Sequence, residues 1–216
     1  FAKAAGKPWV GNMSLGDDTG GAHDGTSAEE LAIDAFVGPG RPGAQLAVAA
    51  GNSGRTTRHF HWSGTLAAGQ TITNTFPLMS FAMGGTDNDI VFIDLWYEGE
   101  DNATVQVVTP GAVTVSAAMG ADSGVVCTPS GAVQIDATNA GDPENGDNQV
   151  MIQIDDSSAC TPSPAPASGT WTIRLVTNSV GPAGGGRFDA WNFSTEQSRW
   201  VAVATCDLAT SVTAPG

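Results

Sequence analysis

The clearest deficit of this 216-residue sequence is basic charge, because it has 8 Lys and Arg against 22 Asp and Glu, a formal net charge of −14. Nucleic-acid binding needs a basic surface that neutralises phosphates, so the composition argues against nucleic acid as a partner. Charged residues make up 14% of the chain and hydrophobic residues 41%, which is enough for a sizeable core. This balance suits a soluble, extracellular protein that can take up calcium.

Long apolar runs are also missing. None approaches the roughly 20 residues of a membrane-spanning helix, so we expect no membrane partner. The first residues, Phe1–Gly6, lack the apolar region of a signal peptide, and the chain does not begin with Met. We therefore expect a mature product or an excised segment.

Cysteine is scarce, and its count of three is odd. Cys127 and Cys160 both begin the string CTPS, whereas Cys206 stands apart. Both CTPS strings adjoin expected strands, and the acidic, Lys-poor composition suggests an oxidising compartment. We therefore expect a disulfide between Cys127 and Cys160 and a free thiol at Cys206.

The N-terminal part has the pattern of a strand, a helix and a second strand. Trp9–Gly16 is a short apolar run that ends in glycine, and Ala44–Gly51 is apolar on both faces, as is typical of a parallel strand. Asp24–Gly40 has a helical pattern that Ser27 or Thr26 can cap, with two glutamates in the first turn. The pattern predicts a right-handed parallel crossover with a ligand site at the polar strand ends.

After about Arg55 the pattern changes to short alternating runs separated by Gly, Asn, Asp and Pro. A period of two at this spacing predicts an antiparallel β-sandwich or jelly roll. The expected strands are QTITNTF, DIVFIDLWYE, ATVQVV, AVTVSA, AVQIDAT, QVMIQID, GTWTIRLV and GRFDAWNF. We thus predict a mixed fold: a partial α/β core over 1–57, an inserted β-sandwich over 58–197 and a return to the core over 198–216.

One apolar run ends in a polar amide held between two glycines. In LAVAAGNSG (Leu46–Gly54), Asn52 is that amide. A turn is the plain interpretation, since Gly, Asn and Ser are common turn residues. The alternative is an oxyanion donor, because asparagine is one of the few side chains that fill this role.

These motifs resemble those of the subtilisin-like serine proteases. NMSLG, a helix and VAAGNSG follow one another over about Pro8–Gly54, and SVTAPG resembles the stretch that leads into the next core strand of such enzymes. The resemblance implies that the α/β part is an incomplete subtilisin-like core with the β-sandwich inserted in it. It also implies a secreted, bacterial serine endopeptidase as the parent protein, with a peptide or protein as substrate.

The resemblance assigns roles to individual residues. Asn52 would donate a hydrogen bond to the oxyanion, which contributes on the order of 3 kcal/mol of transition-state stabilisation. The substrate-contacting residues that it implies are Ser14, Leu15 and Gly16 in one strand, and Ala49, Ala50 and Gly51 in the S1 pocket.

The catalytic Asp, His and Ser motifs of that family fall outside the matching stretches. Asp18, His23 and Ser211 lie in look-alike strings, but Asp18 is in a Gly/Asp loop, His23 follows it too closely, and the chain ends soon after Ser211. We therefore predict that this chain by itself hydrolyses no peptide bond. The alternative function is a non-catalytic β-sandwich module that binds protein, glycan or calcium.

The remaining patterns each have two interpretations. His59 and His61 could supply two zinc ligands, but no third is evident, and a strand is the plainer interpretation. The acidic turns Gly84–Asp89 and Gly141–Asn148 could hold calcium, although neither has EF-hand spacing and solvated turns are commoner. Tryptophans within apolar runs favour core packing over carbohydrate stacking. Those tryptophans are Trp62, Trp96, Trp171, Trp191 and Trp200. We expect no metal among the site residues and no certain cofactor.

Overall fold

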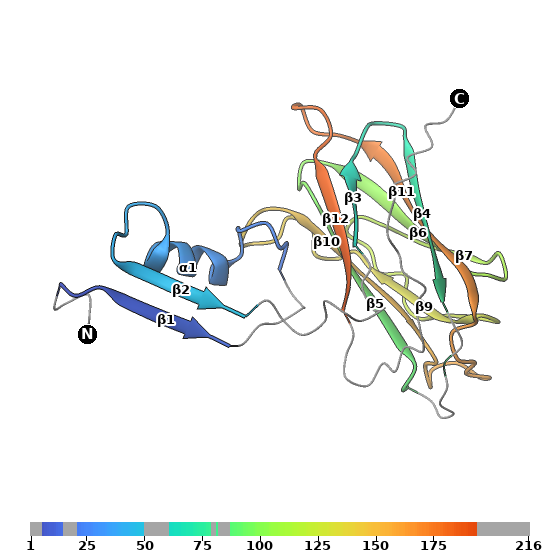
Figure 1. The fold of residues 1–216 in the computed structure, drawn as a ribbon. Helices are drawn as coiled ribbons and strands as arrows, with labels where there is room; N and C mark the ends of the chain where they lie inside the picture. The colour runs from blue at the N-terminus through green and yellow to red at the C-terminus, as the bar shows by residue number, and fades with distance from the viewer. Residues whose placement is uncertain (1–5, 15–20, 50–60, 79–80, 82–86, 194–216) are drawn as a thin grey trace. The chain divides into compact units, whose positions relative to one another are not determined.

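The computed structural model describes residues 6–14, 21–49, 61–78, 81 and 87–193. These residues form one helix and twelve strands, which are arranged in three sheets (Figure 1). The chain divides into two compact units, Phe1–Arg55 and Thr56–Gly216; the described residues of the first form one sheet and those of the second form two.

The first unit consists of two strands and a helix. β1 (Trp9–Met13) and β2 (Ala44–Val48) pair in parallel, and α1 (Ala28–Val37) lies between them in the sequence. The Ser27 Oγ accepts a hydrogen bond from the Glu30 backbone N at 3.3 Å, and the Glu30 carboxylate accepts one from the Ser27 backbone N at 3.2 Å. This reciprocal capping box fixes the start of the helix.

The first unit buries little of its apolar surface. No residue of α1 is buried, and Phe36 on this helix is 63% exposed. Val10 in β1 is 76% exposed, and Val48 in β2 also lies largely in solvent. Parallel strands are normally covered on both faces, so this pair on its own lacks the burial that stabilises such sheets.

The second unit is an antiparallel β-sandwich. Its larger sheet has the order β3-β12-β5-β10-β9-β8, its smaller sheet has the order β4-β11-β6-β7, and every pairing is antiparallel. The larger sheet contains β3 (His61–Thr65), β5 (Ile90–Tyr97), β8 (Val126–Thr128), β9 (Gly131–Asp136), β10 (Asn148–Asp155) and β12 (Arg187–Phe193). The smaller sheet contains β4 (Thr71–Leu78), β6 (Asn102–Val108), β7 (Thr114–Ala118) and β11 (Gly169–Ser179).

The core lies between the two sheets, because alternate residues of each strand point inward. In β10, Val150, Ile152 and Ile154 are fully buried, and the residues between them are partly exposed. Trp171 of β11 meets them from the opposite sheet, and its Nε1 donates to the Ala167 carbonyl at 3.0 Å. Full burial of one such aliphatic side chain stabilises the fold by about 1.5–3 kcal/mol.

The tryptophans divide between the core and the outer face of the larger sheet. Trp62 and Trp171 belong to the core, as the apolar runs indicated. Trp96 is also buried, at 5% exposed, although it lies outside the main core cluster, and the Trp191 ring stacks on that of His61 with centroids 5.4 Å apart. Trp200 lies outside the described residues.

The expected fold class, a mixed fold with a partial α/β subtilisin-like core, is wrong. The described residues are almost entirely β, with one ten-residue helix against twelve strands. The helical pattern of Asp24–Gly40 yields only this helix, and one crossover beside a two-stranded sheet does not build an α/β layer. The expected return to the core over 198–216 lies outside the described residues.

A buried carboxylate joins two chain connections at one end of the sandwich. Asp101, in the turn between β5 and β6, is 4% exposed. Its Oδ1 accepts from the Gly181 N at 2.8 Å and its Oδ2 from the Gly186 N at 2.7 Å, both in the connection between β11 and β12. A Cβ at Gly186 would lie 1.7 Å from the Glu98 Cγ, so only glycine fits there. Asp101 therefore holds together two places where the chain crosses between the sheets.

We predict that amide hydrogens of the sandwich exchange more slowly with solvent than those of the first unit. Strands β10 and β11 are paired on both sides and line the buried core, whereas β1 and β2 carry exposed apolar residues. Hydrogen–deuterium exchange with mass spectrometry on the whole chain measures this directly. Equal or stronger protection of Trp9–Val48 would contradict the prediction.

Candidate functional site

The carboxyl ends of β1 and β2 lie side by side. Met13 is opposite Val48, and the Ala49 N donates to the Met13 carbonyl at 3.1 Å, which continues the pairing past the end of β2. The Asn12 Nδ2 donates to the Ser14 Oγ at 2.8 Å and so positions this hydroxyl beside the strand end. Ligands of open parallel sheets bind at the carboxyl ends of the strands, so this edge is the candidate functional site.

Two of the predicted site residues meet at this edge. Ser14 and Ala49 follow neighbouring strands, whereas Asn52 lies outside the described residues. The other predicted residues outside the described part are Leu15, Gly16, Ala50 and Gly51, together with Asp18 and Ser211 of the look-alike triad. The roles of all these residues remain predictions.

A cavity of about 510 Å³ opens at the opposite, amino-terminal end of the two strands. Trp9 and Phe36 line it and meet edge to face with ring centroids 6.3 Å apart. Lys7 and Arg41 also line it, which places two of the eight basic side chains of the chain there. The cavity is separate from the candidate site at the carboxyl edge.

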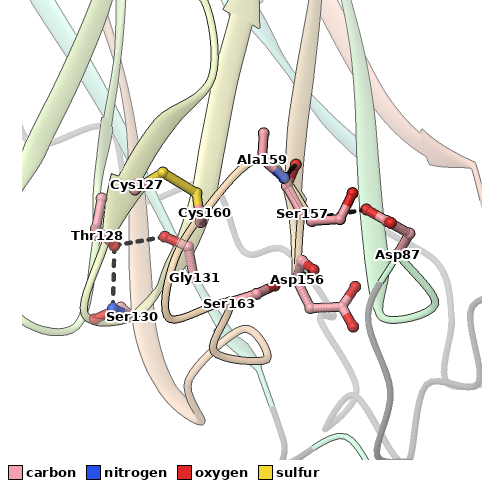
Figure 2. The surroundings of a disulfide bond; sticks show 11 residues. Asp87, Cys127, Thr128, Ser130, Gly131, Asp156, Ser157, Ala159, Cys160 and Ser163 are labelled. Atoms are coloured by element: carbon pink, nitrogen blue, oxygen red, sulfur yellow. Dashed lines mark hydrogen bonds between the residues drawn. A yellow bond between two sulfur atoms is a disulfide. The ribbon is translucent and has the colours of Figure 1, made fainter.

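Cys127 and Cys160 form a disulfide with a Cα–Cα distance of 5.6 Å (Figure 2). Cys127 lies in β8, and Cys160 lies in the connection between β10 and β11. Next to Cys127, the Thr128 Oγ1 donates to the Gly131 carbonyl at 2.7 Å and accepts from the Ser130 N at 3.1 Å. The disulfide therefore links the hydrogen-bonded β8–β9 turn to the β10–β11 connection, which crosses from one sheet to the other.

Four aspartates, termed the acidic corner, lie at the disulfide end of the sandwich: Asp87, Asp89, Asp155 and Asp156. Asp156 is 1% exposed, and its Oδ1 accepts from the backbone N of Asn88 at 2.9 Å and of Asp89 at 3.1 Å. Its Oδ2 is buried and has no hydrogen-bond partner. Figure 2 shows the Asp156 carboxylate pointing towards the segment that carries Asp87.

Two carboxyls of the acidic corner have a raised pKa. Burial raises the pKa of Asp89, and the charge of Asp156 raises it further. Burial also raises the pKa of Asp155, an effect that the hydrogen bond from the Gln153 amide opposes and the charges of Asp156 and Asp87 reinforce. Asp89, Asp155 and Asp156 therefore concentrate negative charge in a poorly hydrated place, beside the exposed Asp87.

A second charged group lies on the outer face of the larger sheet. The His61 Nε2 lies 2.9 Å from the Asp189 Oδ1, and the Arg187 Nε lies 2.5 Å from the Asp189 Oδ2. His59, the other histidine of the HFH string, lies outside the described residues. Throughout the described part of the chain, no three His, Cys, Asp or Glu residues are grouped so that they could hold a metal ion.

The described residues contain no helix that is long and apolar enough to cross a bilayer.

No protein-family model and no curated protein matches this sequence. Among solved structures, the chain is similar to the CspB protease of Clostridium perfringens, with a TM-score of 0.60 and 21% sequence identity. The match covers 94% of this chain and 39% of that one, so this chain spans well under half the length of the protein that it resembles. At this identity the likeness shows the fold alone.

The predicted membership of the subtilisin-like family is wrong on these comparisons, because no family model and no curated sequence supports it. It rested on NMSLG and VAAGNSG, two short strings in which an apolar run ends in turn residues. Such strings follow from strand and turn chemistry in many folds. They therefore specify local structure better than they specify a family.

We predict that replacing both Cys127 and Cys160 with serine lowers the free energy of unfolding by about 3–4 kcal/mol. The bond closes a loop across a sequence separation of 33, and its loss enlarges the conformational freedom of the unfolded chain. Urea denaturation of the double variant measures the loss, and Cys206→Ser is the control, because Cys206 is not in the bond. A double variant as stable as the unmodified chain would contradict the prediction.

We predict that Asp89→Asn stabilises the chain at pH 7 in a buffer with a chelator. The folded-state pKa of Asp89 is above its ordinary value of 3.8, so its contribution to stability is fully present below 3.8 and is lost as the pH rises through the raised value. Asparagine cannot ionise, so the variant should lose less stability than the unmodified chain between these two pH values. Thermal unfolding across pH tests this, with the exposed Asp122→Asn as control, and equal pH profiles for the Asp89 variant and the unmodified chain would refute it.

Proposed function

We propose that this chain is part of a protease-related protein and contributes to its substrate site without supplying the nucleophile. The observation that carries this proposal is the similarity in fold to the CspB protease over 94% of this chain. Because the match covers 39% of that protein, we assign the peptidase activity to a longer parent protein, with a peptide or protein as its substrate.

The proposed contribution to catalysis is oxyanion stabilisation by Asn52. This residue lies three positions after Ala49, whose N–H bonds to the end of β1. Ala49 and Ser14 therefore lie at the same strand edge. An amide that donates to the developing oxyanion contributes on the order of 3 kcal/mol to the transition state and little to the bound ground state. Ser14 and Ala49 would then flank the bound peptide.

The exposed apolar residues of the first unit support its placement within a larger domain. Val10, Val48 and Phe36 together present apolar surface on both strands and the helix. Side chains of this kind are normally covered in a stable parallel sheet. Additional segments of the parent protein would supply that cover.

The ends of the sandwich support its role as an inserted domain. Its first described strand, β3, pairs with its last, β12, and His61 is opposite Trp191. The chain therefore enters and leaves the sandwich at neighbouring points. A domain with adjacent ends fits into a surface loop without separating the elements on either side.

The proposed location of the parent protein is outside the cell. The disulfide between Cys127 and Cys160 suits an oxidising compartment, in which such bonds persist. The excess of 22 acidic over 8 basic residues suits a soluble protein there.

We predict that Asn52→Ala in the full-length parent protein lowers kcat by about 10²–10³-fold and leaves KM nearly unchanged. The hydrogen bond forms with the transition state, so its loss affects the chemical step more than binding. Steady-state kinetics on a peptide substrate measure both constants, and Asn178→Ala, an exposed substitution in the sandwich, is the matched control.

The same experiment has a second arm on the 216-residue chain. A serine without an adjacent base is a weak nucleophile, so a fluorophosphonate probe should leave the purified chain unlabelled. Strong labelling would place the nucleophile within this chain and contradict the proposed division of roles. If the parent protein keeps its kcat after Asn52→Ala, the proposed oxyanion role is contradicted and Asn52 is better interpreted as a turn residue.

A further inference from the structure

We propose that the carboxylates of Asp89 and Asp156 bind a calcium ion at the disulfide end of the sandwich. The site joins the segment just before β5 to the segment just after β10, which are far apart in the sequence. Carboxylate oxygens are the ligands that Ca²⁺ prefers, and Ca²⁺ accepts irregular coordination. The proposal concerns the sandwich alone and does not depend on the protease relation.

The first observation is the buried Asp156 Oδ2, which no donor contacts. The Oδ1 of the same carboxylate accepts from the Asn88 and Asp89 backbone nitrogens, and these bonds hold the group against that segment. Asp156 cannot turn its Oδ2 to solvent without losing both bonds. A buried carboxylate oxygen without a partner is costly, and a bound cation supplies the missing compensation.

The second observation is the sign of the surrounding charge. Asp155 precedes Asp156 in the chain and is 6% exposed, and the Asp87 backbone N donates to the Asp156 carbonyl at 3.2 Å, so two further carboxylates adjoin the site. The basic residues in the described part of the sandwich are Arg174 in β11 and Arg187 in β12, and Arg187 pairs with Asp189. Among the described residues, neither arginine forms an ion pair with these aspartates, so the field at the site favours a cation.

The other acidic turn of the sequence, Gly141–Asn148, shows the contrasting case. The Asp142 Oδ1 accepts from the Glu144 N at 2.9 Å, and its Oδ2 accepts from the Asn139 Nδ2 at 3.0 Å. The Asn148 Oδ1 accepts from the Gly141 N at 3.1 Å. These side-chain oxygens already have protein donors, so this turn has no need of an ion and provides a matched control.

The expected affinity is low. The described residues contain no three acidic, His or Cys side chains placed to hold a metal, so Asp89 and Asp156 would share the ion with water and backbone oxygens. Asp87 and Asp155 add negative potential without being assigned as ligands. A site of this kind belongs with extracellular calcium modules, whose Kd values are roughly 10⁻⁴–10⁻³ M.

Thermal unfolding of the whole chain with and without calcium tests the proposal. At a Ca²⁺ concentration about ten times the Kd, binding shifts the folding equilibrium about 11-fold and raises Tm by roughly 3–6 °C. Asp156→Asn keeps the acceptor for the two backbone bonds, so the variant should be more stable than the unmodified chain in chelator and should not respond to calcium. Asp142→Asn should retain the full calcium response.

Three results would overturn the proposal. The first is no change in Tm of the unmodified chain at about ten times the weakest Kd of this class. The second is an equal rise with sodium chloride of the same ionic strength, which would show screening of the net charge alone. The third is loss of the response in Asp142→Asn as well as in Asp156→Asn. If Asp156→Asn does not fold, Asp89→Asn takes its place, and a full calcium response in that variant would equally overturn the proposal.

Discussion

Packing of the two antiparallel sheets through alternate side chains is the interaction on which the rest of the second unit depends. Val150 and Ile152 from one sheet and Trp171 and Ile173 from the other are fully buried in the same cluster. Because the period of a strand is two, this inward set leaves the outward positions free for polar residues such as Asp189. The Asp101 hydrogen bonds, the disulfide and the acidic corner lie instead at the two ends of the sandwich, where the chain leaves the strands.

The two ends are fastened by different means. At one end, Asp101 binds the N–H groups of Gly181 and Gly186 and so joins the β5–β6 and β11–β12 crossings. At the other, the disulfide between Cys127 and Cys160 joins the β8–β9 turn to the β10–β11 crossing. Each fastening holds a place where the chain passes between sheets, so together they fix the relative position of the two layers. The acidic corner lies at the end that carries the disulfide, where Figure 2 shows two of its members, Asp87 and Asp156, and its like charges oppose close packing.

Local pattern was enough to predict most strands of the sandwich, because alternation such as that of QVMIQID follows directly from one buried face, and Ser27 was among the expected caps. The three-residue strand β8 is too short to carry such a pattern. The order of strands, with β12 between β3 and β5, depends on pairing over long sequence separations. For the same reason the contact between Asp89 and Asp156 could not be predicted. The prediction of an α/β class was wrong because it inferred a whole helical layer from the pattern of a single capped helix.

The pairing of β3 with β12 has a mechanical consequence. The chain enters at His61 and leaves just beyond Trp191, and these residues are opposite each other. Tension between the two flanking segments would therefore load the cross-strand pairs one at a time, from His61–Trp191 towards Thr65–Arg187. Such peeling needs less force than sliding whole strands past one another. The pairing of β3 with β12 would therefore break first under tension. Central strands of the two sheets, such as β5 and β11, would carry little of the load.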